Sequence, residues 1–336
     1  MSARSTAFHA VLVTGASGQL GRRLLPRLID AWYTVKAHYR SQEKAQKYCP
    51  SGIEYVLGDL RDPAWLGQAV RGCDVVIHGA AKVSLRPGQF DEQYKINVEG
   101  TKAVIDACLK NNVKRMIYVS SIVTIGASAN GNPINESAPF NLAGFGIPYV
   151  ETKHEAEMLA LRAIRPGFEV VSVNPSIMIS PPDREVTAAD LRKIPRWLPA
   201  YFDFGLNVVE TDDVISGIIA AIEKGRAGER YLLTGENVDA DRVFELAHKY
   251  FGISKPGLKI PLWVLIPAAW IAEISAGFRH KRPKFHRGLA RLARFRFFYS
   301  NDKAKRELGF NPKSLNVTIE NILEKLQKSN FKNGRF

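Results

Sequence analysis

The sequence contains few cysteines, and their positions suggest neither a metal site nor a disulfide framework. Only three occur among its 336 residues, Cys49, Cys73 and Cys108, and they are widely separated. Zinc sites and small secreted folds use cysteines in closely spaced pairs or in even-numbered sets. We therefore expect no bound metal, and we expect the reducing setting of the cytoplasm.

The sequence also lacks an apolar leader, internal repeats and low-complexity tracts. Residues 1–9 contain no apolar core of the kind that a secretion signal needs, so export is not expected. Hydrophobic residues make up 46% of the chain, which is enough to bury the core of one extended unit or of two lobes. These features favour a large cytoplasmic enzyme.

A glycine-rich turn follows the first apolar run of the chain. Residues 10–13 are typical of a buried parallel strand, and leucines recur at helical spacing over residues 19–30. Between them, the first glycine permits a tight turn, the second lets the backbone approach a pyrophosphate, and the third lets the helix pack on the strand. These glycines are Gly15, Gly18 and Gly21. The turn therefore predicts a dinucleotide site.

The end of the next predicted strand lacks the carboxylate that an NAD-preferring fold directs at the ribose 2′-hydroxyl. Residues 34–39 lead instead to Arg40, which is followed by Ser41 and Lys44. A guanidinium binds phosphate through a bidentate fork, so Arg40 suits the 2′-phosphate of NADP. We expect NADP(H) to be preferred over NAD(H). The alternative is that Arg40 is an ordinary solvated arginine.

Predicted strands and helices alternate over about half the chain, which is typical of a doubly wound parallel sheet. Further strands are expected at residues 53–57, 75–78, 115–119 and 169–173, and long helices over residues 90–110 and from Tyr149 onward. We expect an α/β Rossmann fold with a smaller, mostly C-terminal lobe. The NADP-binding domain is predicted at residues 1–180 and 206–236, and the substrate-binding lobe at residues 181–205 and 237–330.

Six motifs resemble those of the extended short-chain dehydrogenase/reductase superfamily and occur in the same order. They are the turn at residues 14–21, Gly58-Asp59-Leu60, His78-Gly79-Ala80-Ala81, Asn97-Val98-Glu99-Gly100-Thr101, Val119-Ser120-Ser121, and Tyr149 with Lys153. The resemblance runs from Val11 to about Leu233. Asn174-Pro175-Ser176 and the residues after it are similar to the dihydroflavonol, cinnamoyl and 3β-hydroxysteroid-type reductases of this epimerase/dehydratase-like group.

The resemblance implies a role for individual residues. Ser121, Tyr149 and Lys153 would be the catalytic group, and Asn97 would support it. The implied cofactor contacts are Gly15, Ser17, Gly18, Gln19, Leu20, Gly21, Arg40, Asp59, Leu60, Ala80, Ala81, Tyr149, Lys153, Pro175 and Ile177.

The spacing of Tyr149 and Lys153 also has a chemical meaning. Residues four apart lie on one face of a helix, and a neighbouring ammonium favours the tyrosinate, whose ordinary pKa is about 10. Tyr149 would protonate the developing alkoxide during reduction, or deprotonate the carbinol during oxidation. Ser121 would hydrogen-bond the same oxygen.

The C-terminal third combines an apolar segment with a basic one. Residues 259–278 are strongly apolar, but two prolines and Glu273 interrupt them, which argues against a transmembrane span. Residues 279–296 contain eight lysines and arginines, no acid occurs between Glu273 and Asp302, and the formal net charge of the chain is +14.

Three interpretations of the basic segment stay open. It is a solvated lid helix with Leu289, Leu292 and Phe295 inward, a site for an anionic group of the substrate, or part of a peripheral contact of residues 259–296 with an anionic membrane surface. Nucleic-acid binding is not expected, because no recognition motif accompanies the charge.

The function expected is NADPH-dependent reduction of a hydrophobic ketone or aldehyde, or oxidation of the matching secondary alcohol. Two alternatives are a nucleotide-sugar epimerase or dehydratase that retains its cofactor, and a non-catalytic NADP-binding sensor or complex subunit. The sugar alternative is weakened because the Arg-Tyr-x-Asn signature is absent. A homodimer would pair through the helices at residues 90–110 and 149–163.

Overall fold

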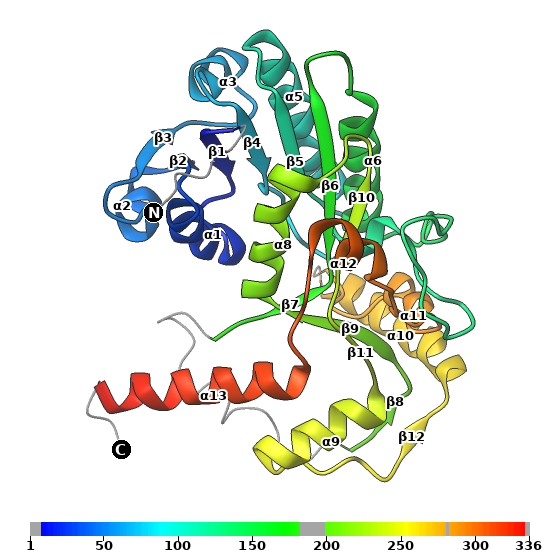
Figure 1. Ribbon diagram of the computed structural model, residues 1–336. Coiled ribbons are helices and arrows are strands. Elements are labelled where there is room, and N and C mark those ends of the chain that lie inside the picture. Colours follow the sequence, from blue (N-terminus) through cyan, green and yellow to red (C-terminus); the bar gives the residue numbers. More distant parts are fainter. Residues whose placement is uncertain (1–7, 182–198, 280–281, 333–336) are drawn as a thin grey trace.

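The computed structural model describes residues 8–181, 199–279 and 282–332, and its centre is a seven-stranded parallel sheet (Figure 1). The strand order is β10-β6-β5-β4-β1-β2-β3. The strands are β1 Ala10–Thr14, β2 Thr34–Tyr39, β3 Glu54–Leu57, β4 Val75–His78, β5 Arg115–Val119, β6 Glu169–Pro175 and β10 Arg230–Leu233. The expected Rossmann-type α/β fold is therefore confirmed.

Helices cover both faces of this sheet. One face packs against α1 Gln19–Asp30, α8 Thr211–Lys224 and α12 Asp302–Leu308. The other packs against α3 Pro63–Val70, α5 Gly100–Lys110 and α6 Pro148–Arg162. The short helix α2 spans Gln42–Tyr48. Successive residues of β1 serve opposite faces, since Val11 and Val13 join the first core and Leu12 joins the second.

The long helix expected over residues 90–110 contains a wider turn in its middle. Helix α4 spans Phe90–Tyr94, a π-helical turn spans Lys95–Glu99, and α5 follows. Within that turn Asn97 accepts a hydrogen bond from the Lys82 backbone at 2.7 Å and donates to the Lys82 carbonyl at 3.1 Å and to Thr152 at 3.0 Å. Asn97 thus holds the chain after β4 against α6, in line with its expected supporting role.

Two smaller sheets lie beyond the carboxyl end of the main sheet (Figure 1). One contains β7 Ile177–Ile179, β9 Gly205–Glu210 and β11 Glu236–Asp239, and the other pairs β8 Tyr201–Phe202 with β12 Lys259–Ile260. Their helices are α9 Ala240–Phe251, α10 Leu265–Phe278, α11 Arg287–Leu292 and α13 Leu315–Lys332. Much of the predicted lobe segment 181–205, namely residues 182–198, lies outside the described residues.

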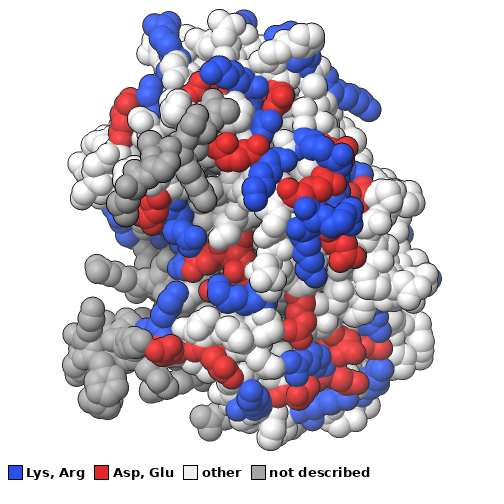
Figure 2. Space-filling model, in the orientation of Figure 1, with Lys and Arg blue, Asp and Glu red and all other residues white. Residues whose placement is uncertain are grey.

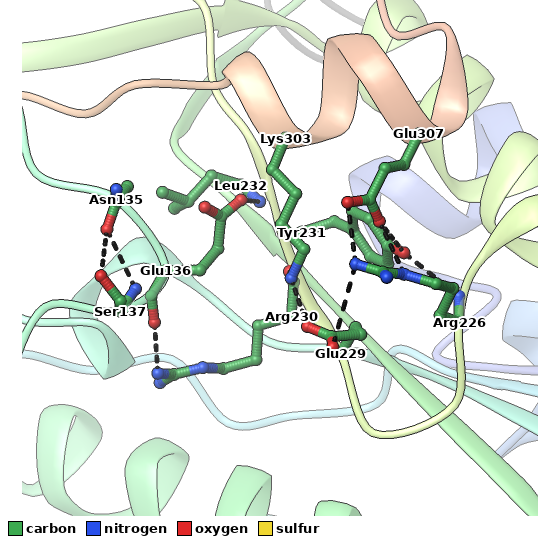
Figure 3. Close-up of polar contacts among 10 residues, drawn as sticks. All are labelled: Asn135, Glu136, Ser137, Arg226, Glu229, Arg230, Tyr231, Leu232, Lys303 and Glu307. Atoms are coloured by element: carbon green, nitrogen blue, oxygen red, sulfur yellow. Dashed lines mark hydrogen bonds and ion pairs between the residues drawn. The ribbon is translucent and has the colours of Figure 1, made fainter.

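Polar contacts join α12 to the edge strand β10 (Figure 3). Lys303 donates to the Arg230 carbonyl at 2.8 Å, and Glu307 accepts from Arg226 at 2.8 Å and from Tyr231 at 2.8 Å. Arg230 donates in turn to the Glu136 carbonyl at 2.5 Å. Exposed ion pairs of this kind contribute little individually, but here they fix α12 and the loop near Glu136 against one sheet edge.

Candidate active site

A cavity of about 660 Å³ lies at the carboxyl ends of β1, β2 and β4. The glycine turn and the strand ends line it through Gly15, Ser17, Gly18, Arg40, Asp59, Leu60, Ala80 and Ala81, which are among the expected cofactor contacts. The order of strands reverses between β1 and β4, and such switch points form the ligand crevice of doubly wound folds.

The glycine turn has the geometry that a pyrophosphate needs. Gly15 has φ of 78°, and a Cβ atom there would lie 2.8 Å from the Ala80 nitrogen. A Cβ at Gly21 would collide with the Gly15 carbonyl. Helix α1 begins directly after Gly18 without a side-chain cap, so the amides of its first turn are available to an anion. The turn therefore fits a dinucleotide.

Other predicted cofactor residues lie beside this cavity rather than in its lining. Gln19 donates to the Ser180 hydroxyl at 2.7 Å, which ties the glycine turn to the chain after β7. Leu20 packs on the core, and Gly21 is buried in α1. Pro175 is buried at the end of β6, while Ile177 is 44% exposed.

Two arginines, Arg40 and Arg61, line the cavity. Arg40 is exposed at the end of β2 and lines the cavity. Asp59 accepts from Arg61 Nε at 2.9 Å, and this pairing lowers the pKa of Asp59 to about 2. Arg61 also lines the cavity. Arg61 was not among the cofactor contacts predicted from the sequence, although it follows the predicted contact Asp59 by only two residues.

Helix α6 carries Tyr149 and Lys153 on one face and begins at Pro148, whose fixed φ suits the first helical position. Lys153 is buried and donates to the Tyr118 hydroxyl at 2.9 Å and to the Val119 carbonyl at 2.9 Å. Burial lowers the pKa of Lys153 to about 7, and the Glu157 charge opposes that shift. Lys153 is thus a buried amine whose charge changes near neutral pH.

Tyr149 differs from the expectation that its pKa is lowered. Burial raises the pKa of the Tyr149 hydroxyl, and a hydrogen bond with Ser121 only partly opposes this. The Lys153 hydrogen bonds described above go to Tyr118 and Val119, so the lysine charge does not reverse the effect of burial. In this structure the Tyr149 hydroxyl therefore stays protonated beside Ser121, and the expected lowering of its pKa is not found.

Tyr118 is a member of the site that sequence reasoning missed. It lies in register with His78 of β4, and His78 lies in register with Thr14 of β1. His78 is hydrogen-bonded to Thr14 at 2.7 Å and to Thr101 at 3.0 Å, and burial lowers its pKa to about 3. A neutral polar row thus runs beneath the cofactor cavity toward Lys153. The only sequence signal was a tyrosine among the apolar residues that follow Arg115 in β5.

A second buried polar group lies one helical turn beyond Lys153. Glu157 has no exposed surface, and it accepts from Ser172 at 2.6 Å and from Asn174 at 2.6 Å. Asn174 also donates to Thr124 at 3.0 Å and to the Ser121 carbonyl at 3.3 Å. Glu157 therefore connects α6 with β6 and with the turn that carries Ser121.

Tyr149 lies against an apolar cluster. Tyr149 packs on the cluster of Ala127, Leu142, Ile147 and Val150. Leu289, Leu292 and Phe295 pack on the same cluster, so the inward direction predicted for these three side chains is confirmed. The reacting oxygen of a substrate at Tyr149 would thus adjoin a mostly hydrophobic surface.

Comparison with known proteins identifies the family of this chain. A model of the NAD dependent epimerase/dehydratase family matches residues 11–234. The 4-hydroxy-2-methyl-3-oxo-4-farnesyl-3,4-dihydroquinoline-1-oxide ketoreductase of Stigmatella aurantiaca is 34% identical, over 89% of this chain and 90% of its own length. Sterol demethylase protein B of Methylococcus capsulatus is 30% identical, over 90% of this chain and 94% of its own length.

A solved structure has the same fold. The UDP-glucose 4-epimerase of Thermotoga maritima superposes with a TM-score of 0.73, at 20% identity, over 95% of this chain and 99% of the epimerase. The family match covers the glycine turn and the Tyr149–Lys153 pair. The chain therefore belongs to the NAD-dependent epimerase/dehydratase family and is an NAD(P)-dependent oxidoreductase of the extended short-chain dehydrogenase/reductase type.

Proposed function

We propose that this enzyme uses NADP(H) to reduce a hydrophobic ketone or aldehyde, or to oxidise the corresponding secondary alcohol. The observation that carries the substrate class is the position of Tyr149, which packs on the same apolar cluster as Leu289, Leu292 and Phe295. A sugar ring needs hydrogen-bond partners for its hydroxyl groups, and apolar side chains supply none. An apolar carbonyl compound gains by burial there.

The chain's own residues would handle the oxygen of the substrate. The nicotinamide supplies or accepts the hydride at the substrate carbon. Tyr149 donates its proton to the oxygen during reduction and accepts the proton during oxidation, while Ser121 holds the oxygen by a hydrogen bond. Lys153 supplies positive charge beneath this pair, and its neutral form becomes available near pH 7.

The preference for NADP(H) is proposed from Arg40. Arg40 lines the same cavity as Asp59 and Leu60. No carboxylate occupies the end of β2, where a ribose 2′-hydroxyl would be recognised. Arg40 would bind the 2′-phosphate through its fork of N–H donors.

Two relatives support the substrate class by their names. The ketoreductase acts on a compound that carries a farnesyl group, and the other relative is named for sterol demethylation. We propose a substrate of similar apolar character.

The remaining proposals concern organisation. We propose the two-part division of the chain stated above, and a cytoplasmic location with the three cysteines reduced, since all are free thiols in the structure.

Pairing of two copies through α4, α5 and α6 stays a prediction. Charged side chains at exposed positions there, including Glu99, Lys102 and Glu155, are unlike the apolar core of an obligate interface.

The test is a turnover assay with NADPH and carbonyl compounds of increasing apolar size. We expect one NADPH consumed per carbonyl reduced, with kcat/KM rising with apolar size. Leu292→Asp should lower kcat/KM for the largest compounds and leave the smallest nearly unchanged. Conversion of a nucleotide sugar without net NADPH consumption, and no turnover of any hydrophobic carbonyl or alcohol, would reject the proposal in favour of an epimerase or dehydratase.

A further inference from the structure

Helix α10 exposes an apolar face to solvent. It lies beside α11 in the smaller lobe (Figure 1). We define the α10 face by the large apolar side chains that it and the preceding turn expose, which are Trp263, Ile266, Trp270, Ile271, Ile274 and Phe278. Trp263 is 74% exposed and Phe278 is 84% exposed. Exposed apolar side chains that occur singly need no explanation, but a continuous group marks an interaction site.

The opposite face of α10 packs against α11. Leu265 and Ala269 are buried and form a cluster with Ala290 of α11. These residues follow one side of the helix, and Trp270, Ile274 and Phe278 recur on the other at a spacing of four. The α10 face is therefore not needed for the contact between α10 and α11. A helix that is apolar all round and lies at a surface is suited to an apolar partner.

The charges beside the α10 face are basic. Arg279 directly follows Phe278 and is exposed, and Arg282 is exposed three residues later. The single acid of α10, Glu273, is bonded to Arg287 at 2.8 Å. On the side of the molecule drawn in Figure 2, basic and acidic side chains alternate instead. The end of α10 thus combines exposed aromatic and aliphatic groups with exposed arginines, although Glu92 lies close enough to Arg282 for the arginine charge to lower the Glu92 pKa.

The segment after α10 contacts the loop that follows the cofactor cavity. His286 is hydrogen-bonded to the Leu85 carbonyl at 2.8 Å, and Arg282 lies against Gly88. Val83, at the start of the same loop, lines the cofactor cavity and is 68% exposed. The loop that carries Val83, at the cofactor cavity, is therefore in contact with the residues that follow α10.

We propose that the α10 face docks on an anionic lipid bilayer. Tryptophan and phenylalanine insert at the level of the headgroups, and arginine beside them attracts anionic lipid. A bilayer that contains anionic lipid fits both features of this surface, the exposed apolar side chains and the arginines that follow them. The inference rests on the proposed function in one respect: a bilayer would present hydrophobic substrate beside the cavity.

None of the helices in the described ranges has the length and apolar character needed to span a bilayer, so the proposed contact is peripheral. The test uses the full chain with vesicles of phosphatidylcholine, alone or mixed with phosphatidylserine. We expect sedimentation with the mixed vesicles, loss of binding at high salt, and quenching of Trp263 and Trp270 fluorescence by brominated acyl chains.

Two sets of variants distinguish vesicle binding through the α10 face from non-specific adsorption of the protein to vesicles. Trp270→Glu combined with Phe278→Glu should weaken vesicle binding at least tenfold, whereas Trp32→Glu should not change it, although Trp32 is 83% exposed. Arg279→Glu combined with Arg282→Glu should weaken binding by about thirtyfold or more, at roughly 1 kcal/mol for each basic residue near the surface. Lys110→Glu, at an exposed position at the end of α5, is the matched control.

Three results would overturn the inference. The first is equal binding to neutral and mixed vesicles, and the second is an equal loss of vesicle binding in Trp32→Glu. The third is a wild type that does not bind vesicles but forms a dimer in light scattering, where the Trp270 and Phe278 changes dissociate that dimer. The last result would assign the α10 face to a second copy. Turnover of a water-soluble carbonyl compound is measured in the same variants and should be retained. Vesicle binding without any turnover would reject the proposed function alone.

Discussion

Lys153 donates a hydrogen bond to the Tyr118 hydroxyl at 2.9 Å, which ties the catalytic helix α6 to the strand β5 beneath it. The lysine also lies over the Tyr118 ring, 4.3 Å from its centroid. Tyr118 is therefore the tyrosine that contacts this lysine, whereas the sequence predicted Tyr149 as its partner. Tyr118 is completely buried, while Tyr149 is partly exposed and next to Ser121. We therefore propose that Tyr149, and not Tyr118, is the tyrosine that meets a substrate.

This difference predicts opposite outcomes for two conservative changes. Tyr149→Phe should lower kcat by about 10²- to 10⁴-fold, the usual contribution of a general acid, while cofactor binding in calorimetry stays near that of the wild type. Tyr118→Phe removes one hydrogen-bond partner of Lys153 and should lower kcat by less than about tenfold. If the Tyr118 change were as damaging as the Tyr149 change, Tyr149 would not be the proton donor.

Much of the cofactor half could be predicted from the sequence because its signals are local. The strand at residues 75–78 and the helix at residues 19–30 have the predicted bounds, since apolar runs and leucine spacing report directly on burial. The backbone of the glycine turn was predictable for the same reason. A positive φ at Gly15 and close approach at Gly21 leave no other residue type suitable.

The electrostatics of the catalytic group could not be predicted in this way. The spacing of Tyr149 and Lys153 indicates one helix face, but it contains no information on what lies beneath Lys153. That environment comes from β5, through Tyr118 and the Val119 carbonyl, in a contact between residues 35 apart in the chain. Burial of both side chains then shifts both pKa values, and burial is a property of the assembled fold.

Arg40 and Arg61 provide a paired test of cofactor preference. Arg61 is bonded to Asp59 through two of its nitrogens, while Arg40 lies at the cavity edge. Arg40→Ala should weaken NADPH binding roughly tenfold to hundredfold, the range for a hydrogen-bonded charge, and change NADH binding little. Arg61→Ala should weaken both cofactors to a similar extent. Calorimetry with each cofactor measures this, and a wild type that binds NADH as well as NADPH would refute the role of Arg40.

Glu157 should control the pH range of activity through Lys153. Its charge raises the pKa of Lys153 against the effect of burial. Glu157→Gln keeps the size of the side chain but removes the charge, so the Lys153 pKa should fall and the alkaline limb of the kcat/KM profile should move to lower pH. Ser172→Ala removes a hydrogen bond to Glu157 and keeps the charge, so it should leave the limb in place. An unmoved limb in Glu157→Gln would show that Glu157 has only a structural role.

The buried lysine also predicts how stability depends on pH in the absence of cofactor. Burial lowers the pKa of Lys153 from its ordinary value of 10.5 to about 7, so between these values the unfolded chain binds more protons than the folded chain. The free energy of unfolding should therefore rise with pH over this window, by on the order of 1 kcal/mol between about pH 7 and pH 8.5. Lys153→Met should lose this rise.

Urea unfolding of the wild type and of Lys153→Met at several pH values measures the difference. Lys102→Met is the control, because Lys102 is exposed and paired only with Asp106, so it should follow the wild type. Parallel curves for the wild type and Lys153→Met would mean that Lys153 is as readily protonated in the folded chain as in the unfolded one. The amine would then stay charged at neutral pH and could not change its protonation state during turnover.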